Sequence, residues 1–133
     1  MKNQTQQSVT ERIKTIADAI AELGEADNEV IRYQKLLTVL TDPTDHLVNY
    51  QTAVVLVRAI NERREPNWDD PNEWKYFNWF CMGGSSGFRF DDYDVWRSLS
   101  RVGSRLCFFD PEHGEYLAKQ FPEVFKHFML IIK

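Results

Sequence analysis

The chain is short of the residues that hold metals or form disulfides. It has two cysteines and three histidines among 133 residues, and Cys81 and Cys107 show neither CxxC spacing nor paired histidines nearby. This pattern favours buried free thiols in a reducing cytosol over a disulfide or a zinc site. We therefore expect no bound metal and no cofactor.

Long apolar runs are also missing. The longest run, residues 53–57, is far shorter than a helix that crosses a bilayer. The first ten residues hold one lysine and no apolar stretch, which is unlike a secretory signal peptide. These absences predict a cytoplasmic protein that does not contact a membrane.

An excess of positive charge is the third absence. The formal net charge is −4, with 16 Lys and Arg residues against 20 Asp and Glu residues. Non-specific DNA binding depends on neutralising phosphates, so the charge of the whole chain does not support it. The net charge of the whole chain does not exclude a local basic face.

Catalytic motifs are absent as well. His46, His113 and His127 are scattered, and no HExxH or GxSxG motif occurs. The glycine-rich segment 83–87 lacks the GK[ST] ending of a phosphate-binding loop, so we expect a hairpin turn there. We expect a protein that is not an enzyme.

Two catalytic alternatives stay open beside that expectation. Cys107 with His113 could form a thiolate pair, although a cysteine between two apolar residues is more typical of a core. A glycosidase is the second alternative, because such an enzyme needs two carboxylates. Adjacent aspartates on a strand point to opposite faces and do not pair with each other, which weakens this alternative. The acidic residues that could supply the carboxylates are Glu73, Asp91, Asp92 and Asp94.

Helix signals occupy the first half of the chain. Ser8 and Glu11 fit a capping box, and apolar residues at three-and-four spacing follow as far as Gly24. This pattern predicts one helix over 9–23, after a disordered segment 1–8.

Two more helices are predicted before residue 65. Asp27 or Asn28 can cap a helix that ends near residue 40, and the Asp42-Pro43 pair can start another that runs towards Arg64. The middle of this third helix is apolar in every direction, so we expect it to be buried on several sides.

Strand signals follow in the second half. Aromatic and alternating segments predict a three-stranded antiparallel meander at about 75–81, 87–96 and 104–109. The Asp91-Asp92 pair breaks the alternation, and a β-bulge there would restore it.

A final helix is predicted from Asp110-Pro111, with a kink between Ala118 and Phe121 caused by Pro122. The fold class is therefore α+β: N-terminal helices, a small three-stranded antiparallel meander, and a C-terminal helix packed on the sheet. We expect one domain spanning residues 1–133.

Aromatic residues concentrate in the stretch 68–109, which holds 12 of the 18 in the chain. Such rings each bury about 150–250 Å², so the cluster is either a core or a binding surface. Four arginines fall within residues 89–105, which contain no lysine, and aromatic rings lie between them. Guanidinium groups stack on aromatic faces and bind carboxylates or phosphates. Internal pairing with nearby aspartates is the alternative. The candidate binding residues are Trp68, Trp74, Trp79, Arg89, Tyr93, Trp96, Arg97 and Arg101.

An ordered series of short motifs spans roughly residues 50–130. The motifs are AINE at 59–62, PNW at 66–68, KYFNWF at 75–80, SSGF at 85–88, VGSRLCF at 102–108 and EYLAKQF at 115–121. The series resembles a group of small proteins of gut anaerobes, their prophages and other mobile elements, for which no function is known. The resemblance implies a small accessory protein of phage or mobile-element type. The chain departs from the pattern at Arg63-Arg64 and at Pro122.

We interpret the chain as a non-enzymatic binding or protein-interaction module that uses its aromatic and arginine-rich β region. The expected contact is a protein partner or a second copy. Single-stranded nucleic-acid binding on the sheet is the alternative, because arginine and aromatic side chains hold unpaired bases. A glycan-binding domain or a small hydrolase is a further alternative.

Overall fold

The structure is a computed structural model that describes residues 7–84 and 87–132. Most of the segment 1–8, where disorder is expected, and part of the expected 83–87 turn lie outside these residues. The described elements are α1 (Val9–Arg12), α2 (Ile16–Leu23), α3 (Asn28–Val39), α4 (His46–Ile60), β1 (Lys75–Cys81), β2 (Arg89–Trp96), the 3₁₀ helix η1 (Ser104–Leu106), α5 (Pro111–Gln120) and α6 (Pro122–Met129).

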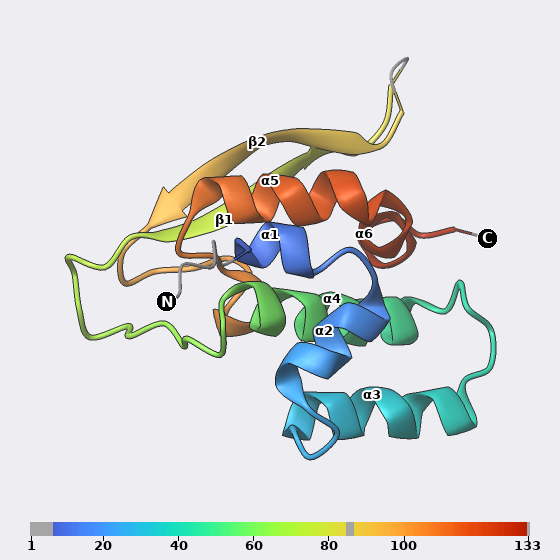
Figure 1. The fold of residues 1–133 in the computed structure, drawn as a ribbon. Helices are drawn as coiled ribbons and strands as arrows, with labels where there is room; N and C mark the ends of the chain where they lie inside the picture. The colour runs from blue at the N-terminus through green and yellow to red at the C-terminus, as the bar shows by residue number, and fades with distance from the viewer. Residues whose placement is uncertain (1–6, 85–86, 133) are drawn as a thin grey trace.

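Figure 1 shows these elements in layers. The β1–β2 hairpin lies at one side, α5 runs along it, α4 lies in the middle, and α3 lies on the far side of α4. One hydrophobic cluster connects the layers, with Leu56 of α4, Leu117 of α5 and Phe125 of α6 among its members. The expected α+β class is confirmed.

The first helical segment is broken, whereas one helix over 9–23 was predicted. The capping box of Ser8 starts α1 as expected, but Thr15 and Asp18 form a second capping box that starts α2. Ile13, between the two helices, is extended and fully buried. Its carbonyl oxygen accepts a hydrogen bond from the Tyr116 hydroxyl of α5, so a partner far along the chain stabilises the break.

Helix α4 is the central helix, and 11 of its 15 residues are buried, as its apolar middle predicts. Its predicted start was wrong: Asp45 is the N-cap, because the carboxylate of Asp42 closes the preceding turn instead. The helix ends at Ile60 rather than near Arg64. Glu62 and Arg63 turn the chain with φ angles of 54° and 67°.

Two other predicted N-caps are confirmed. Asp27 precedes α3 and accepts a hydrogen bond from Glu29 N–H at 3.0 Å. Asp110 precedes α5 and accepts one from Glu112 N–H at 2.9 Å, with Pro111 at the first helical position.

The two strands form one antiparallel hairpin with the predicted bulge. Trp79 pairs with Asp92 and Phe80 pairs with Phe90, so Asp91 is the extra residue on β2. A bulge at the predicted Asp91-Asp92 position is confirmed.

The predicted third strand over 104–109 does not form. Residues 104–106 make the 3₁₀ helix η1. Within the described residues, the segment 104–109 pairs with β1 through a single bridge, between Tyr76 and Phe108. The Cys107 carbonyl oxygen accepts a hydrogen bond from the Asn61 side chain at 2.9 Å. Because this contact ties the segment to the end of α4, its backbone does not extend the ladder.

The C-terminal helix packs on the sheet as predicted, but Pro122 breaks it completely. Proline has no N–H to continue the helical ladder, and Phe121 leaves helical geometry at φ −125° and ψ 54°. The result is two helices, α5 and α6, instead of one kinked helix. This break lets α6 turn onto α4 while α5 stays on the hairpin (Figure 1).

Candidate binding surface

Lys75, at the start of β1, holds together the loops that carry several candidate residues. It is fully buried, and its ammonium donates hydrogen bonds to the carbonyl oxygens of Asn67 at 2.7 Å and Asp70 at 3.2 Å. A third bond goes to the carbonyl oxygen of Arg97. The buried ammonium therefore joins the 67–70 loop to the end of β2.

Glu73 completes the anchor around Lys75. Its carboxylate lies 3.3 Å from the ammonium and accepts hydrogen bonds from Arg64 at 2.9 Å and from Asn67 N–H at 2.7 Å. Burial alone would raise the pKa of Glu73, but these partners hold it below the usual value. Sequence reasoning missed Lys75, since a lysine at the start of a strand is normally exposed.

Trp68 belongs to the same anchor. Its indole N–H donates to the Ser104 hydroxyl at 2.7 Å, and its ring lies 5.2 Å from the Lys75 ammonium. It is half-buried. Trp68 therefore positions the loops and is less exposed than Trp74 and Trp79.

Two other candidate tryptophans each have an arginine over the ring. The Arg97 guanidinium lies 4.4 Å from the centre of the Trp74 ring, and that of Arg101 lies 5.9 Å from the Trp96 ring. In the described part of the chain, neither guanidinium has a carboxylate partner. Their charge is available to a group outside the chain.

Two aspartates of β2, Asp92 and Asp94, accept hydrogen bonds from backbone N–H groups of their own strand. Tyr76 exchanges both of its backbone hydrogen bonds with the segment after η1, so the N–H of its partner Val95 must point away from β1. Asp94 accepts that N–H at 2.8 Å, and Asp92 accepts the N–H of Tyr93 at 2.8 Å. The two carboxylates satisfy donors that a further strand would use, which protects the free edge of β2.

Expected internal pairing of arginine with aspartate occurs within β2 at Arg89, whose guanidinium lies 3.4 Å from Asp91. Asp92 and Asp94 bind the backbone instead. The aspartates therefore neutralise only part of the arginine charge in this region.

The strand register divides the candidates between two faces. Trp96 pairs with Lys75, and Trp79 lies four positions further along β1, so Trp79 and Trp96 share a face. Tyr93 pairs with Asn78 and lies on the opposite face, where Asn78 contacts α5. The eight predicted residues therefore do not form one continuous surface.

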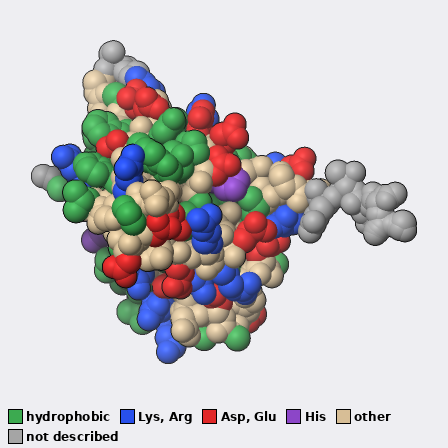
Figure 2. Space-filling view, turned by 90° about the vertical axis from the view of Figure 1, so that its left-hand side faces the viewer, with side chains coloured by type: hydrophobic (Ala, Val, Ile, Leu, Met, Phe, Trp, Pro, Cys, Tyr) green, Lys and Arg blue, Asp and Glu red, His purple; other side chains and the backbone are tan. Residues whose placement is uncertain are grey.

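Some of the aromatic cluster is core and some is surface. Phe77 and Phe108 are buried, and Phe80 stacks on Phe125 of α6 with ring centres 5.3 Å apart. Figure 2 shows hydrophobic side chains gathered below the hairpin tip, with charged side chains among them. The exposed apolar residues of β1 and its neighbouring loops include Trp74, Trp79, Leu99 and Val102, at 45%, 53%, 70% and 41% exposure.

We define the Trp–Arg surface as Trp74, Trp79, Trp96, Arg97, Leu99 and Arg101, without Trp68 and Tyr93. Trp96 is half-buried, and the other five residues are exposed. Arg89 lies beside it, near the hairpin tip.

Catalytic arrangements receive little support from the geometry. Burial raises the pKa of the Cys107 thiol to about 12, which disfavours the thiolate that a nucleophile needs. Glu73 is part of the Lys75 anchor, and Asp92 and Asp94 bind backbone amides. Among the described residues, no group of three or more His, Cys, Asp or Glu side chains could hold a metal.

Comparison with family models, curated proteins and solved structures finds no match to this chain. None of the helices within 7–84 and 87–132 has the length and apolar character needed to cross a membrane.

Proposed function

We propose that the chain is a non-enzymatic interaction module whose Trp–Arg surface binds another protein. The observation that carries this proposal is the pair of arginines over Trp74 and Trp96, without internal carboxylate partners in the described residues. Tryptophan and arginine are the residue types that contribute most binding energy at protein interfaces.

The chemistry of this surface suits a partner that presents carboxylates beside apolar side chains. A guanidinium that lies over a ring can still direct its in-plane N–H groups to a carboxylate. Leu99 and Trp79 add exposed apolar area to the surface. Because Asp92 and Asp94 occupy the edge amides of β2, recognition would proceed through side chains rather than by adding a strand.

Nucleic acid fits the surface less well than protein. Asp91 and Asp92 are exposed on the same hairpin, where they would repel phosphates. The lysine of this region, Lys75, is buried and directed at carbonyl oxygens of the chain.

We also propose that the protein acts in the cytoplasm as an accessory protein of phage or mobile-element type. The motif resemblance supports the second part, and the free thiols of Cys81 and Cys107 suit a reducing compartment. The genes beside its own would test this assignment: genes for virion structure, replication or conjugation would agree with it, and metabolic genes would not.

The binding proposal is tested with a purified partner that co-purifies with the chain from cells that encode it. Calorimetric titration should show affinity at least about tenfold weaker for Trp79→Ala and for Arg97→Ala than for the unmodified chain. Val39→Ala is the matched control, because Val39 is 76% exposed on α3, away from the hairpin.

Two further measurements separate the alternatives. Sedimentation of the chain alone detects self-association, and a labelled single-stranded oligonucleotide at low salt detects nucleic-acid binding. Wild-type affinity in both surface variants would refute the protein-binding role of this surface, and tight oligonucleotide binding that these variants abolish would replace it with the nucleic-acid alternative.

A further inference from the structure

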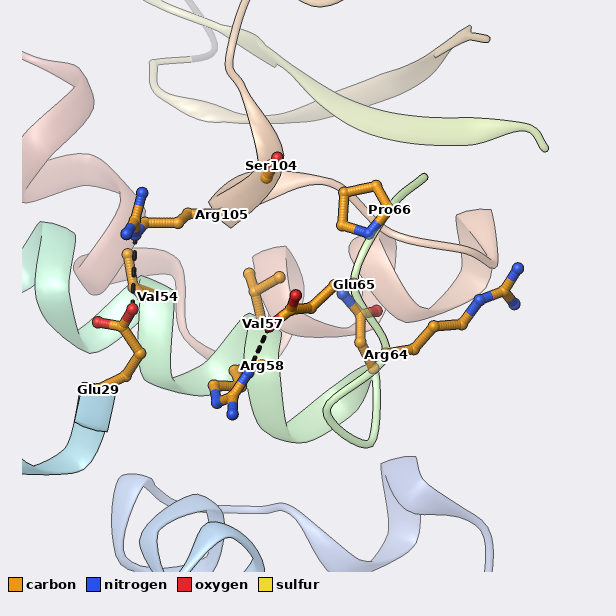
Figure 3. A pocket seen from close by; sticks show the side chains of 10 residues that line it. Glu29, Val54, Val57, Arg58, Arg64, Glu65, Pro66, Ser104 and Arg105 are labelled. Atoms are coloured by element: carbon orange, nitrogen blue, oxygen red, sulfur yellow. Dashed lines mark ion pairs between the residues drawn. The ribbon is translucent and has the colours of Figure 1, made fainter. Parts of the chain in front are cut away.

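A cavity of about 240 Å³ lies between α4, the loop that follows it and η1. This volume has room for several waters or for a small molecule. Figure 3 shows that charged side chains from separate segments surround it, with valines of α4 between them. The residues that matter here are Glu29, Val54, Val57, Arg58, Glu65 and Arg105.

Arg58 is only half satisfied at this site. Its Nε donates to the buried Asp27 carboxylate at 2.9 Å, which fixes the side chain. Its Nη1 lies 3.6 Å from Glu65, beyond hydrogen-bond distance, and the Glu65 side chain is 80% exposed. Because exposed ion pairs contribute little free energy, a second anion can displace Glu65 at small cost.

Arg105, on the other side of the cavity, has unused donors as well. Its Nε lies 3.5 Å from Glu29, and its terminal nitrogens donate no hydrogen bond within the described residues. Glu29 is already satisfied by Gln51 at 2.9 Å and by Arg32 at 3.1 Å. The guanidinium of Arg105 therefore keeps its terminal N–H groups for another acceptor.

Arg64 lines the same cavity but has its own partners. It donates to Glu73 at 2.9 Å and lies 3.9 Å from the centre of the Phe109 ring. In Figure 3 its guanidinium points away from Arg58 and Arg105. Three arginines and two glutamates line the cavity, and Asp27 and Glu73 pair with Arg58 and Arg64 from outside the lining.

We propose that this cavity binds a compact anion, the carboxylate or phosphate group of a small molecule. The terminal nitrogens of Arg58 and Arg105 donate to the anion, which takes the place of the Glu65 carboxylate. Guanidinium groups with free terminal nitrogens match the oxygens of both anions. This site is separate from the Trp–Arg surface, and its test does not depend on a protein partner.

Titration of the full chain with inorganic phosphate, and separately with acetate, at constant ionic strength tests this proposal. Backbone amide chemical shifts should change saturably around residues 58, 65 and 105 with at least one of the two anions. Saturation with phosphate alone identifies the ligand class as phosphate, and saturation with acetate alone identifies it as carboxylate. No saturation with either anion would overturn the proposal.

Two variants test the assigned roles, and both avoid Arg58, whose loss would remove the nearest ion-pair partner of the buried Asp27 carboxylate. Glu65→Gln removes the internal competitor and should tighten anion binding by about twofold to fivefold. Arg105→Gln removes a charged donor and should weaken it by about tenfold. Glu25→Gln and Lys35→Gln are controls with the same charge changes on exposed residues elsewhere. Equal effects from variants and controls would show general charge screening and would refute the site.

Discussion

Asn78 of β1 donates a hydrogen bond from its side-chain nitrogen to the carbonyl oxygen of Gly114 in α5, at 2.9 Å. This hydrogen bond joins the hairpin to α5, the helix that covers it. It depends on a close approach of β1 to α5 at Gly114. A Cβ atom at position 114 would lie 2.5 Å from Asn78 Oδ1 and 2.9 Å from the Phe108 ring. The packing of sheet on helix therefore requires glycine at this position.

Gly114→Ala should destabilise the protein by about 1–3 kcal/mol, because overpacking outweighs the better helix propensity of alanine. Urea unfolding monitored by circular dichroism measures the change. Gly83→Ala is the matched control, since a Cβ there meets nothing within 4 Å, and its stability should stay close to that of the unmodified chain. A Gly114→Ala protein as stable as the control would contradict the close approach.

Lys75→Met should destabilise the protein by about 2–4 kcal/mol, because three carbonyl oxygens and the Glu73 carboxylate lose their shared donor. Hydrogen exchange should accelerate over 67–73 and 97–104 more than in α4. The exposed Lys35→Met change is the control and should leave both measurements unchanged. If exchange in the loops does not respond, Lys75 does not anchor them.

Replacement of both Asp92 and Asp94 by alanine should open the free edge of β2. The amides of Tyr93 and Val95 then lack their acceptors, and pairing with another chain becomes favourable. Sedimentation velocity should show concentration-dependent self-association, with monomer stability changed by less than about 1 kcal/mol. Asp91→Ala, at the bulge, is the control, and a purely monomeric double variant would count against edge protection.

Acid should weaken the contact between α3 and α4 through Asp27. Burial alone would raise the pKa of this carboxyl, but the hydrogen bonds from Arg58 and from Glu29 N–H lower it below the usual 3.8. A group with a lowered pKa in the folded state stabilises the fold above its unfolded pKa, and this contribution is lost as the pH falls through the folded pKa.

The stability difference between the unmodified chain and Asp27→Asn should therefore be largest near neutral pH and shrink below about pH 4. Urea unfolding at a series of pH values measures it. Asp69→Asn, at an exposed position, is the control and should show a smaller difference at neutral pH. A constant difference at every pH would mean that the ionised carboxylate does not stabilise the fold.

The amino-acid sequence by itself determined the features that depend on near neighbours. The caps at Ser8, Asp27 and Asp110, the bulge at Asp91, and the burial of α4 all follow from residues a few positions apart. Local hydrogen bonds and side-chain periodicity decide such features, so a single sequence is enough to predict them.

The tertiary structure alone decided the features that depend on distant partners. The break at Ile13 is stabilised by Tyr116, 103 positions away, and the segment after η1 is held by Asn61, 46 positions away. Burial of Lys75 and the contact of Arg105 with Glu29 likewise arise from segments brought together by packing. Hydrogen bonds formed across the folded chain override local strand and helix preferences, and sequence spacing carries no record of them.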